Sequence, residues 1–301
     1  MENELNVTYI TLGGLVDMDT YKYLYFSIMF TAYILIIWFN FTIICLIWIH
    51  RNLHEPMYIF IAALLFNSVL FSTNIYPKLL TCLFQFFNIY SLGGSEFLLL
   101  TAMSYDRYVS ICKPLQYPTI MRRRTVSIIL VLAWLVPACE IAVTTILSAE
   151  TKLCNLTLNG IFCNNAIYSL HCENSKVQSL FGVVAVIITA MFPVLFILFT
   201  YTRILIISYR SSRNVRRKAA QTCLPHLLVL ISFSCLCAFD VTIVRLGSDI
   251  PKTVHLIITL QTILYHPLFN PIIYGLKMKE ISKHLKRLSE IIGTFSKGSN
   301  Y

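Results

Sequence analysis

Seven long apolar segments, separated by short polar connections, constrain the fold of this chain more than any other feature. A helix needs about 20 mostly apolar residues to cross the hydrocarbon core of a bilayer. Hydrophobic residues make up 57% of the chain and charged residues only 13%, whereas a soluble domain carries about a quarter charged residues. The sequence therefore predicts an all-α membrane protein, a bundle of seven transmembrane helices. The expected spans are residues 23–49, 57–77, 79–102, 125–147, 177–202, 219–239 and 253–276.

The distribution of lysine and arginine predicts which way this bundle faces. With the N-terminus outside, 18 of the 24 basic residues fall in the cytosolic connections and the tail, and such an excess marks the cytosolic side. No basic leader precedes an apolar core, so the first span is expected to act as an uncleaved signal anchor. We expect an extracellular N-terminus (1–22), the bundle (23–276) and a cytosolic amphipathic helix and tail (277–301), in a multi-pass protein of the plasma membrane.

The segment after the seventh span has its own periodicity. Ile281, Leu285, Leu288 and Ile292 recur at helical spacing, with basic residues at the intervening positions. Residues 277–292 are therefore expected to form an amphipathic helix on the anionic inner leaflet. A solvated tail helix is the alternative.

Two other readings of the composition can be set aside. The net charge of +10 does not indicate a nucleic-acid partner, because the basic residues lie in clusters between apolar runs and not on one polar face. The ten cysteines are scattered and form no CxxC pairs, which argues against zinc. The lipid bilayer is the expected environment, and no cofactor is expected. Asn6 and Asn155 begin glycosylation sequons on the predicted outer side.

Two short motifs lie near the cytosolic ends of their spans. A DRY triplet at 106–108 ends the third, an NPIIY sequence at 270–274 closes the seventh, and Trp134 lies within the fourth. Together they resemble the rhodopsin-like G-protein-coupled receptors. The sequences LHEPMY (53–58), MSYDRYVSIC (103–112), KAAQTCLPH (218–226) and PLFNP (267–271) are more specific. They resemble the signatures of vertebrate odorant receptors over nearly the whole chain.

The resemblance implies that a heterotrimeric G protein binds the cytosolic end, a stimulatory one that raises cyclic AMP. Arg107 alone could simply reach the headgroups, but beside Asp106 its charge can be held and then released on activation. The base of the sixth span offers no carboxylate, so Tyr201 or Tyr274 is expected to hold or receive Arg107. Pro271 kinks its span, either as a hinge or as a static bend. The residues assigned to activation and coupling are Asp106, Arg107, Tyr108, Tyr201, Asn270, Pro271 and Tyr274.

Glu96 is an ionisable residue inside the third span, where such residues usually face the bundle interior and mark function. In the family a carboxylate here joins an aspartate of the second span around a sodium ion. Asn67 occupies the aspartate position in this chain. With one carboxylate left, sodium at Glu96 is disfavoured, and a protonated Glu96 is the alternative.

Three cysteines crowd the second outer loop, in an oxidising compartment. The resemblance implies disulfides between Cys82 and Cys163 and between Cys154 and Cys172, which would hold the loop as a lid. Only four residues separate Pro77 from Cys82, a connection much shorter than in the family. A tight turn over 78–81 is geometrically possible. A disulfide, however, needs the Cα atoms of Cys82 and Cys163 within about 7 Å of each other, and so short a turn can prevent that approach.

A small-molecule odorant is expected to bind below the outer loop, between the third, fifth, sixth and seventh spans. An amine receptor would want an aspartate at position 89, where this chain has isoleucine, so small and largely apolar ligands are favoured. Taken singly, each of these wall positions serves packing more often than ligand contact. The expected wall residues are Phe86, Ile89, Tyr90, Gly93 and Gly94.

Other classes of membrane protein make different demands on the sequence. A retinal photoreceptor needs a lysine in the last span, and residues 253–276 contain none. A transporter would show internal repeats; the sequence has none, and a transporter stays the alternative from another class. His255 and His266 do not form a catalytic cluster, so no enzyme is expected. A non-odorant receptor for a lipid or peptide shares the fold and the motifs, and stays open as an alternative.

Overall fold

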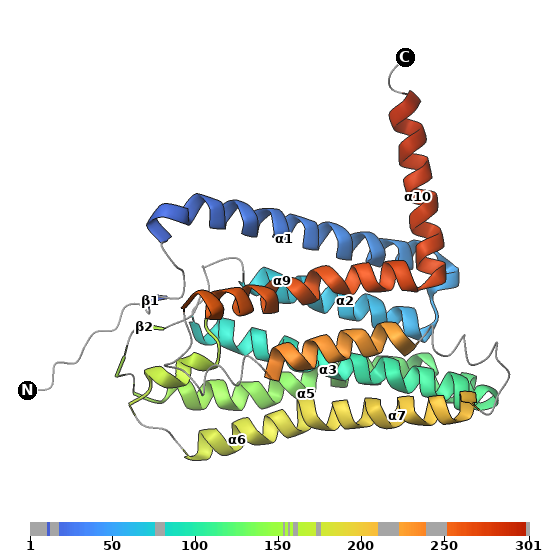
Figure 1. Cartoon of the computed structure of the whole chain (residues 1–301). Coiled ribbons are helices and arrows are strands. Elements are labelled where there is room, and N and C mark those ends of the chain that lie inside the picture. Colours follow the sequence, from blue (N-terminus) through green and yellow to red (C-terminus); the bar gives the residue numbers. More distant parts are fainter. Residues whose placement is uncertain are drawn as a thin grey trace, which may run out of the picture.

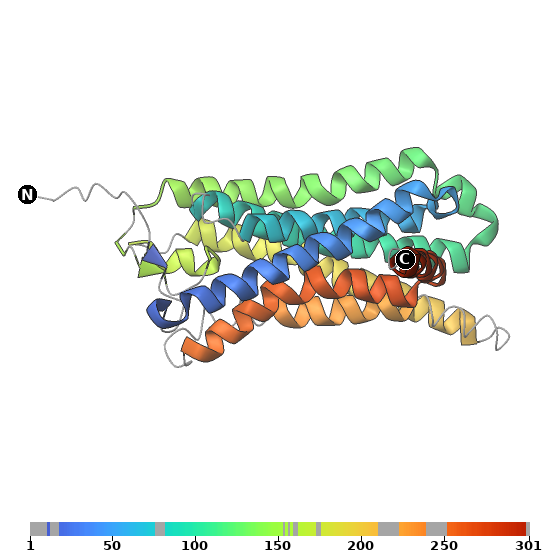
Figure 2. The ribbon, with the colours of Figure 1, turned by 90° about the horizontal axis from the view of Figure 1, so that it is seen from above.

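The computed structural model shows a bundle of long helices that run side by side (Figure 1). It describes residues 11–12, 18–75, 82–152, 154–155, 157–158, 162–172, 176–209, 223–238 and 252–298. Each of the seven predicted spans contains a described helix, which confirms the all-α prediction. The view turned by 90° in Figure 2 shows the same lengthwise packing.

The elements have the following bounds in chain order. The helices are α1 (Met18–Ile49), η1 (Arg51–Leu53), α2 (Pro56–Ile75), α3 (Cys82–Cys112), η2 (Pro114–Gln116), α4 (Tyr117–Ile120), α5 (Arg123–Ala149), η3 (Asn165–Leu170), α6 (Lys176–Val186), η4 (Ile187–Met191), α7 (Phe192–Tyr209), α9 (Lys252–Lys277) and α10 (Lys279–Gly298). A further apolar helix, Cys223–Ala238, lies in the sixth predicted span. Two short strands, β1 (Thr11–Leu12) and β2 (Thr157–Leu158), pair in parallel at the outer end.

Many large apolar side chains lie on the outside of the bundle. Among the residues that the structure describes, four stretches are long and apolar enough to cross a membrane: Tyr23–Ile49, Pro56–Asn74, Arg123–Ala149 and Lys176–Tyr209. Large side chains such as Trp38, Phe41, Leu195 and Phe199 point outward. A soluble protein could not tolerate such a surface, whereas a lipid environment favours it.

Several helix ends differ from the predicted span limits. The third span was expected to end at residue 102, yet α3 continues to Cys112, because a hydropathy criterion stops near charges although the helix does not. Helix α2 is described as far as Ile75, and the predicted limit of the second span at Pro77 lies outside the described residues. The tight turn proposed for 78–81 lies outside the described residues.

The fifth span is one long helical path with a local defect. Between α6 and α7 the five residues Ile187–Met191 form a π-helical stretch. Pro193 follows at once, and a proline cannot donate to the carbonyl four residues earlier, here that of Thr189. A π-bulge is a usual way to absorb such a mismatch within a helix.

The third span lies at the centre of the bundle, and α10 lies outside it. Helix α3 packs against α2, α5 and α7, and its inward side chains, such as Leu99, Leu100 and Met103, are fully buried. After a bend at Met278, α10 leaves the end of the bundle opposite the strands and points away from the bundle axis (Figure 1). It extends to Gly298, further than the predicted residue 292.

Candidate functional site

The C-terminal end of α3 holds a three-residue polar cluster. Asp106 is fully buried and accepts hydrogen bonds from Arg107, at 3.1 Å from Nε and 2.7 Å from Nη2. Its other oxygen accepts a hydrogen bond from the hydroxyl of Tyr117 at 2.8 Å. Burial, and then the negative charge of Asp106, raises the pKa of Tyr117 well above its ordinary value, so that the phenol stays a donor. Asp106 therefore holds the Arg107 side chain in place.

The expected tyrosine partners of Arg107 lie elsewhere. The hydroxyl of Tyr201 is buried and has no hydrogen-bond partner among the residues that the structure describes. The hydroxyl of Tyr274 lies 3.3 Å from Nδ1 of His226, in the helix Cys223–Ala238. In this conformation Asp106 holds Arg107, because the adjacent carboxylate is within reach. That Tyr201 or Tyr274 receives Arg107 on activation stays a prediction.

Pro271 has a defined structural consequence in α9. A proline frees the carbonyl four residues before it, which here belongs to Pro267. The side-chain amide of Asn40 in α1 donates to that carbonyl at 2.8 Å. In an apolar environment an unpaired carbonyl is costly, so Asn40 stabilises the bend at the point where α9 meets α1.

Four polar side chains meet in the interior of the bundle, and we call Ser68, Glu96, His266 and Asn270 the core cluster. The amide of Asn270 donates to Oε1 of Glu96 at 2.9 Å and to the hydroxyl of Ser68 at 3.2 Å. Nδ1 of His266 lies 3.3 Å from the same Glu96 oxygen. The Glu96 and His266 side chains are both 4% exposed. The cluster links α2, α3 and α9.

Asn67 lies one residue before Ser68 and has its own partners. Its amide nitrogen donates to the carbonyl of Leu92 at 3.0 Å, and its oxygen accepts a hydrogen bond from the Trp134 indole at 3.2 Å. Asn67 thus ties α2 to α3 and α5. It contributes neither a charge nor a free oxygen to the core cluster.

The outer end is closed by two disulfides. Cys82 is bonded to Cys163, with a Cα–Cα distance of 5.4 Å, and Cys154 to Cys172, with 4.8 Å. The short connection after α2 therefore leaves Cys82 within bonding distance of the outer loop. Asn155, beside the second disulfide, is exposed, whereas Asn6 lies outside the described residues.

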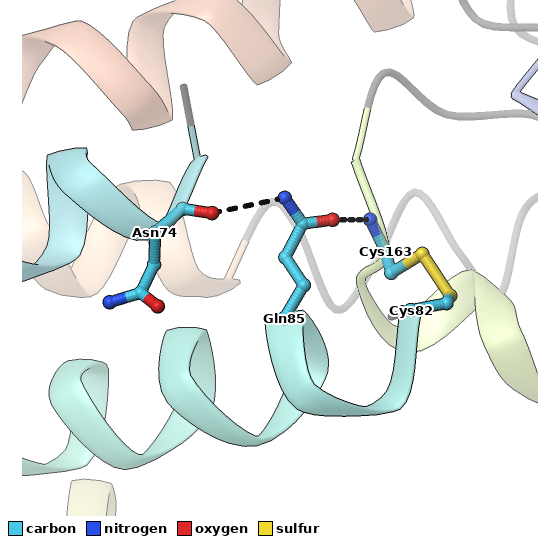
Figure 3. Close-up of a disulfide and its surroundings, with 4 residues drawn as sticks. All are labelled: Asn74, Cys82, Gln85 and Cys163. Atoms are coloured by element: carbon cyan, nitrogen blue, oxygen red, sulfur yellow. Dashed lines mark hydrogen bonds between the residues drawn. A yellow bond between two sulfur atoms is a disulfide. The ribbon is translucent and has the colours of Figure 1, made fainter. Parts of the chain in front are cut away.

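Gln85 joins the first disulfide to the end of α2 (Figure 3). Its amide nitrogen donates to the carbonyl of Asn74 at 3.2 Å, and its oxygen accepts the backbone N–H of Cys163 at 3.0 Å. The side chain is buried. One glutamine thus connects α2, α3 and the outer loop.

The expected ligand-wall residues fall into two groups. Phe86 and Tyr90 have ring centroids 4.8 Å apart, and Phe86 also meets Tyr168 of the outer loop at 5.9 Å. Burial raises the pKa of Tyr168 to about 12, so this phenol is uncharged. Ile89, on the same helix, is buried in an apolar cluster with Phe162. Phe86, Ile89 and Tyr90 thus lie beneath the outer loop.

The two glycines differ from each other. A Cβ added to Gly93 would have no other heavy atom within 4 Å, so this position borders open space. A Cβ added to Gly94 would lie 2.8 Å from the Cβ of Pro137 in α5. Gly94 thus serves close packing of α3 against α5, and its place in the ligand wall stays a prediction.

Sequence reasoning missed several members of these clusters. Tyr117 sits in a connection without a periodic pattern, and Gln85 is one amide among many. His266 was considered only for its spacing from another histidine. A buried histidine next to a proline in a span is itself an unusual signal, and it could have drawn attention to His266.

Comparison with known proteins places the chain in a family. The family model described as olfactory receptor matches residues 26–290. Olfactory receptor 2AP1 of Homo sapiens is 32% identical over 307 residues, covering 95% of this chain and 97% of the relative. Olfactory receptor 11A1 of Homo sapiens is 31% identical over 299 residues, covering 94% of each. The chain belongs to the olfactory receptor family, and is thus an odorant receptor of the G-protein-coupled type, multi-pass in the plasma membrane.

Proposed function

We propose that this receptor binds small, largely apolar odorants from the outer side and activates a stimulatory heterotrimeric G protein, which raises cyclic AMP. The observation that carries the proposal is the Asp106–Arg107 pair with its third partner, Tyr117. Asp106 holds the Arg107 guanidinium at the end of α3. From there Arg107 can be released to a cytosolic partner.

The wall beneath the outer loop supports the ligand class. Phe86, Ile89 and Tyr90 present aromatic and aliphatic surface, and open space borders Gly93. Binding sites for small apolar molecules have this composition. The two disulfides hold the loop above this wall as a lid, and the exposed Asn155 is available for glycosylation on the same side.

The mechanism is a shift of population between two arrangements of the bundle. Tyr274 is fully buried and contacts His226, which joins α9 to the helix Cys223–Ala238. Asn270 and Pro271 lie one turn away, where the bend of α9 is stabilised by Asn40. In this mechanism ligand binding moves these helices, Tyr274 leaves His226, and Arg107 is released from Asp106 to the G protein.

The test is odorant-evoked cyclic AMP in cells sorted for surface display of an N-terminal tag. We expect a dose-dependent response that Arg107→Ala abolishes at equal surface density. Arg123→Ala is the matched control, because Arg123 is also cytosolic but exposed at the start of α5, and it should preserve the response. A response that survives Arg107→Ala would contradict the proposed coupling.

A further inference from the structure

We infer that His266 takes the place that a sodium ion would occupy beside Glu96, so that the core cluster is completed by the protein's own side chains. The inference concerns the interior of the bundle and does not depend on the ligand or the G protein proposed above. It rests on which atoms face Glu96 and on what the neighbouring oxygens already bind.

One oxygen of the buried Glu96 carboxylate, Oε1, faces two nitrogen atoms. Oε1 accepts the amide hydrogen of Asn270 at 2.9 Å and has Nδ1 of His266 at 3.3 Å. Both ring nitrogens of His266 are buried and have no aligned hydrogen-bond partner among the described residues. The 3.3 Å approach of Nδ1 therefore places the imidazole in the space next to Oε1 that a bound cation would need.

The side-chain oxygens of Ser68 and Asn67 on α2 already have hydrogen-bond partners. A hard cation needs several oxygen ligands directed at it. The hydroxyl of Ser68 donates to the carbonyl of Leu64 at 3.1 Å and accepts the hydrogen bond of Asn270. The oxygen of Asn67 is bound to the Trp134 indole. The described side chains therefore offer one carboxylate, already paired, and no second negative charge.

The imidazole of His266 is held in this position by aromatic rings. Phe233 meets it edge-on, with centroids 4.4 Å apart, and the neighbouring Tyr265 lies 5.7 Å away. The hydroxyl of Tyr265 is within hydrogen-bond distance of Ser232, at 3.3 Å, which ties this group to the helix Cys223–Ala238. The packing thus directs Nδ1 of His266 toward Glu96 and makes the histidine a structural part of the contact between these helices.

The primary experiment compares thermal unfolding of the purified full-length protein in nanodiscs in sodium chloride and in choline chloride of equal concentration. We expect the same midpoint in both salts for the unmodified protein. His266→Ala removes the neighbour of Glu96 and opens space beside it, where water can supply the oxygen ligands that the side chains lack. The variant should therefore have a lower midpoint in choline and gain a saturable sodium-specific rise of roughly 2–4 °C.

His226→Ala is the matched control, because His226 is also a buried histidine but contacts Tyr274 and not Glu96. It should be destabilised equally in both salts. A saturable sodium-specific rise in the unmodified protein that Glu96→Gln abolishes would overturn the inference. A folded His266→Ala variant that ignores sodium would overturn it too.

A double-mutant cycle keeps the inference testable if His266→Ala does not fold. Direct pairing predicts that Glu96→Gln lowers the midpoint less in a His266→Gln background than in the unmodified protein, since the partner has already been removed. Equal losses in both backgrounds would show that the two residues do not act together. None of these measurements requires an odorant, so their failure and failure of the proposed signalling function are distinguishable.

Discussion

The imidazole rings of His50 and His284 lie with their centroids 3.8 Å apart, and this contact joins the end of α1 to the cytosolic helix α10. Nε2 of His284 also lies 3.3 Å from the side-chain amide of Asn52. Since an amide nitrogen can only donate, His284 accepts at Nε2 and is neutral in this arrangement. The docking of α10 therefore depends on an uncharged histidine.

This contact predicts that the docking of α10 weakens in acid. Burial, and then the nearby positive groups of His50, Arg287 and Lys283, lower the pKa of His284, while Glu280 opposes them. A lowered pKa means that the undocked state binds the proton more readily. The stabilisation is therefore present above the ordinary pKa of histidine and is lost as the pH falls through the lowered value.

Hydrogen exchange along α10 at about pH 7.5 and about pH 5 measures this effect, because histidine changes charge in that window. We expect faster exchange in α10 at the lower pH, after correction for intrinsic rates. His284→Phe should remove the pH dependence, whereas the substitution of the exposed His54 should not. Equal protection at both pH values would refute the role of His284.

Tyr117→Phe is predicted to raise basal signalling. The substitution removes the hydroxyl that donates to Asp106 at 2.8 Å and so weakens the hold of Asp106 on Arg107. A loss of ~1 kcal/mol from a hydrogen bond of this kind corresponds to about a fivefold rise in basal cyclic AMP per displayed receptor. Tyr209→Phe, at an exposed position at the end of α7, is the control. An unchanged basal level would mean that Tyr117 does not restrain the pair.

Gln85→Leu is predicted to destabilise the outer end. The change leaves the backbone N–H of Cys163 without its partner in a buried setting, which costs about 1–3 kcal/mol. Thermal unfolding and surface display by flow cytometry should both decline. Asn88→Leu is the control one turn away, because Asn88 is half-buried and its amide donates to the carbonyl of Phe84 in its own helix. Equal effects of the two variants would contradict the bridging role of Gln85.

The adjacent glycines of α3 are predicted to respond differently to alanine. Gly94→Ala forces a Cβ against Pro137, and such overpacking costs about 1–3 kcal/mol, so surface display should decline. Gly93→Ala adds a methyl group to open space. It should leave display intact and change the odorant concentration that gives a half-maximal response. A Gly93→Ala receptor with normal display and an unaltered dose response would exclude this position from the ligand wall.

Much of the fold was predictable from the sequence because it depends on local composition. The seven apolar runs predict the spans, and the lysines and arginines predict their orientation, since each of these signals acts over a single segment. The same local logic misplaced helix ends. Helix α3 continues to Cys112 through charged residues, because its buried face and the Asp106–Arg107 pair compensate for charges that a hydropathy criterion counts as an end.

The tertiary structure decided which polar groups meet. Glu96 and His266 lie 170 positions apart in the chain and 3.3 Å apart in the bundle, and nothing in the local sequence of either residue specifies the other. The partners of Asp106, the bridge made by Gln85 and the contrast between Gly93 and Gly94 are of the same kind. The sequence by itself determined that a seven-span receptor forms, because burial of apolar segments in lipid is a property of each segment. The packing of those segments against one another determined which side chains become neighbours. Contacts between helices depend on how each helix is rotated about its axis and how deep it lies in the membrane, and the sequence of one segment does not specify either.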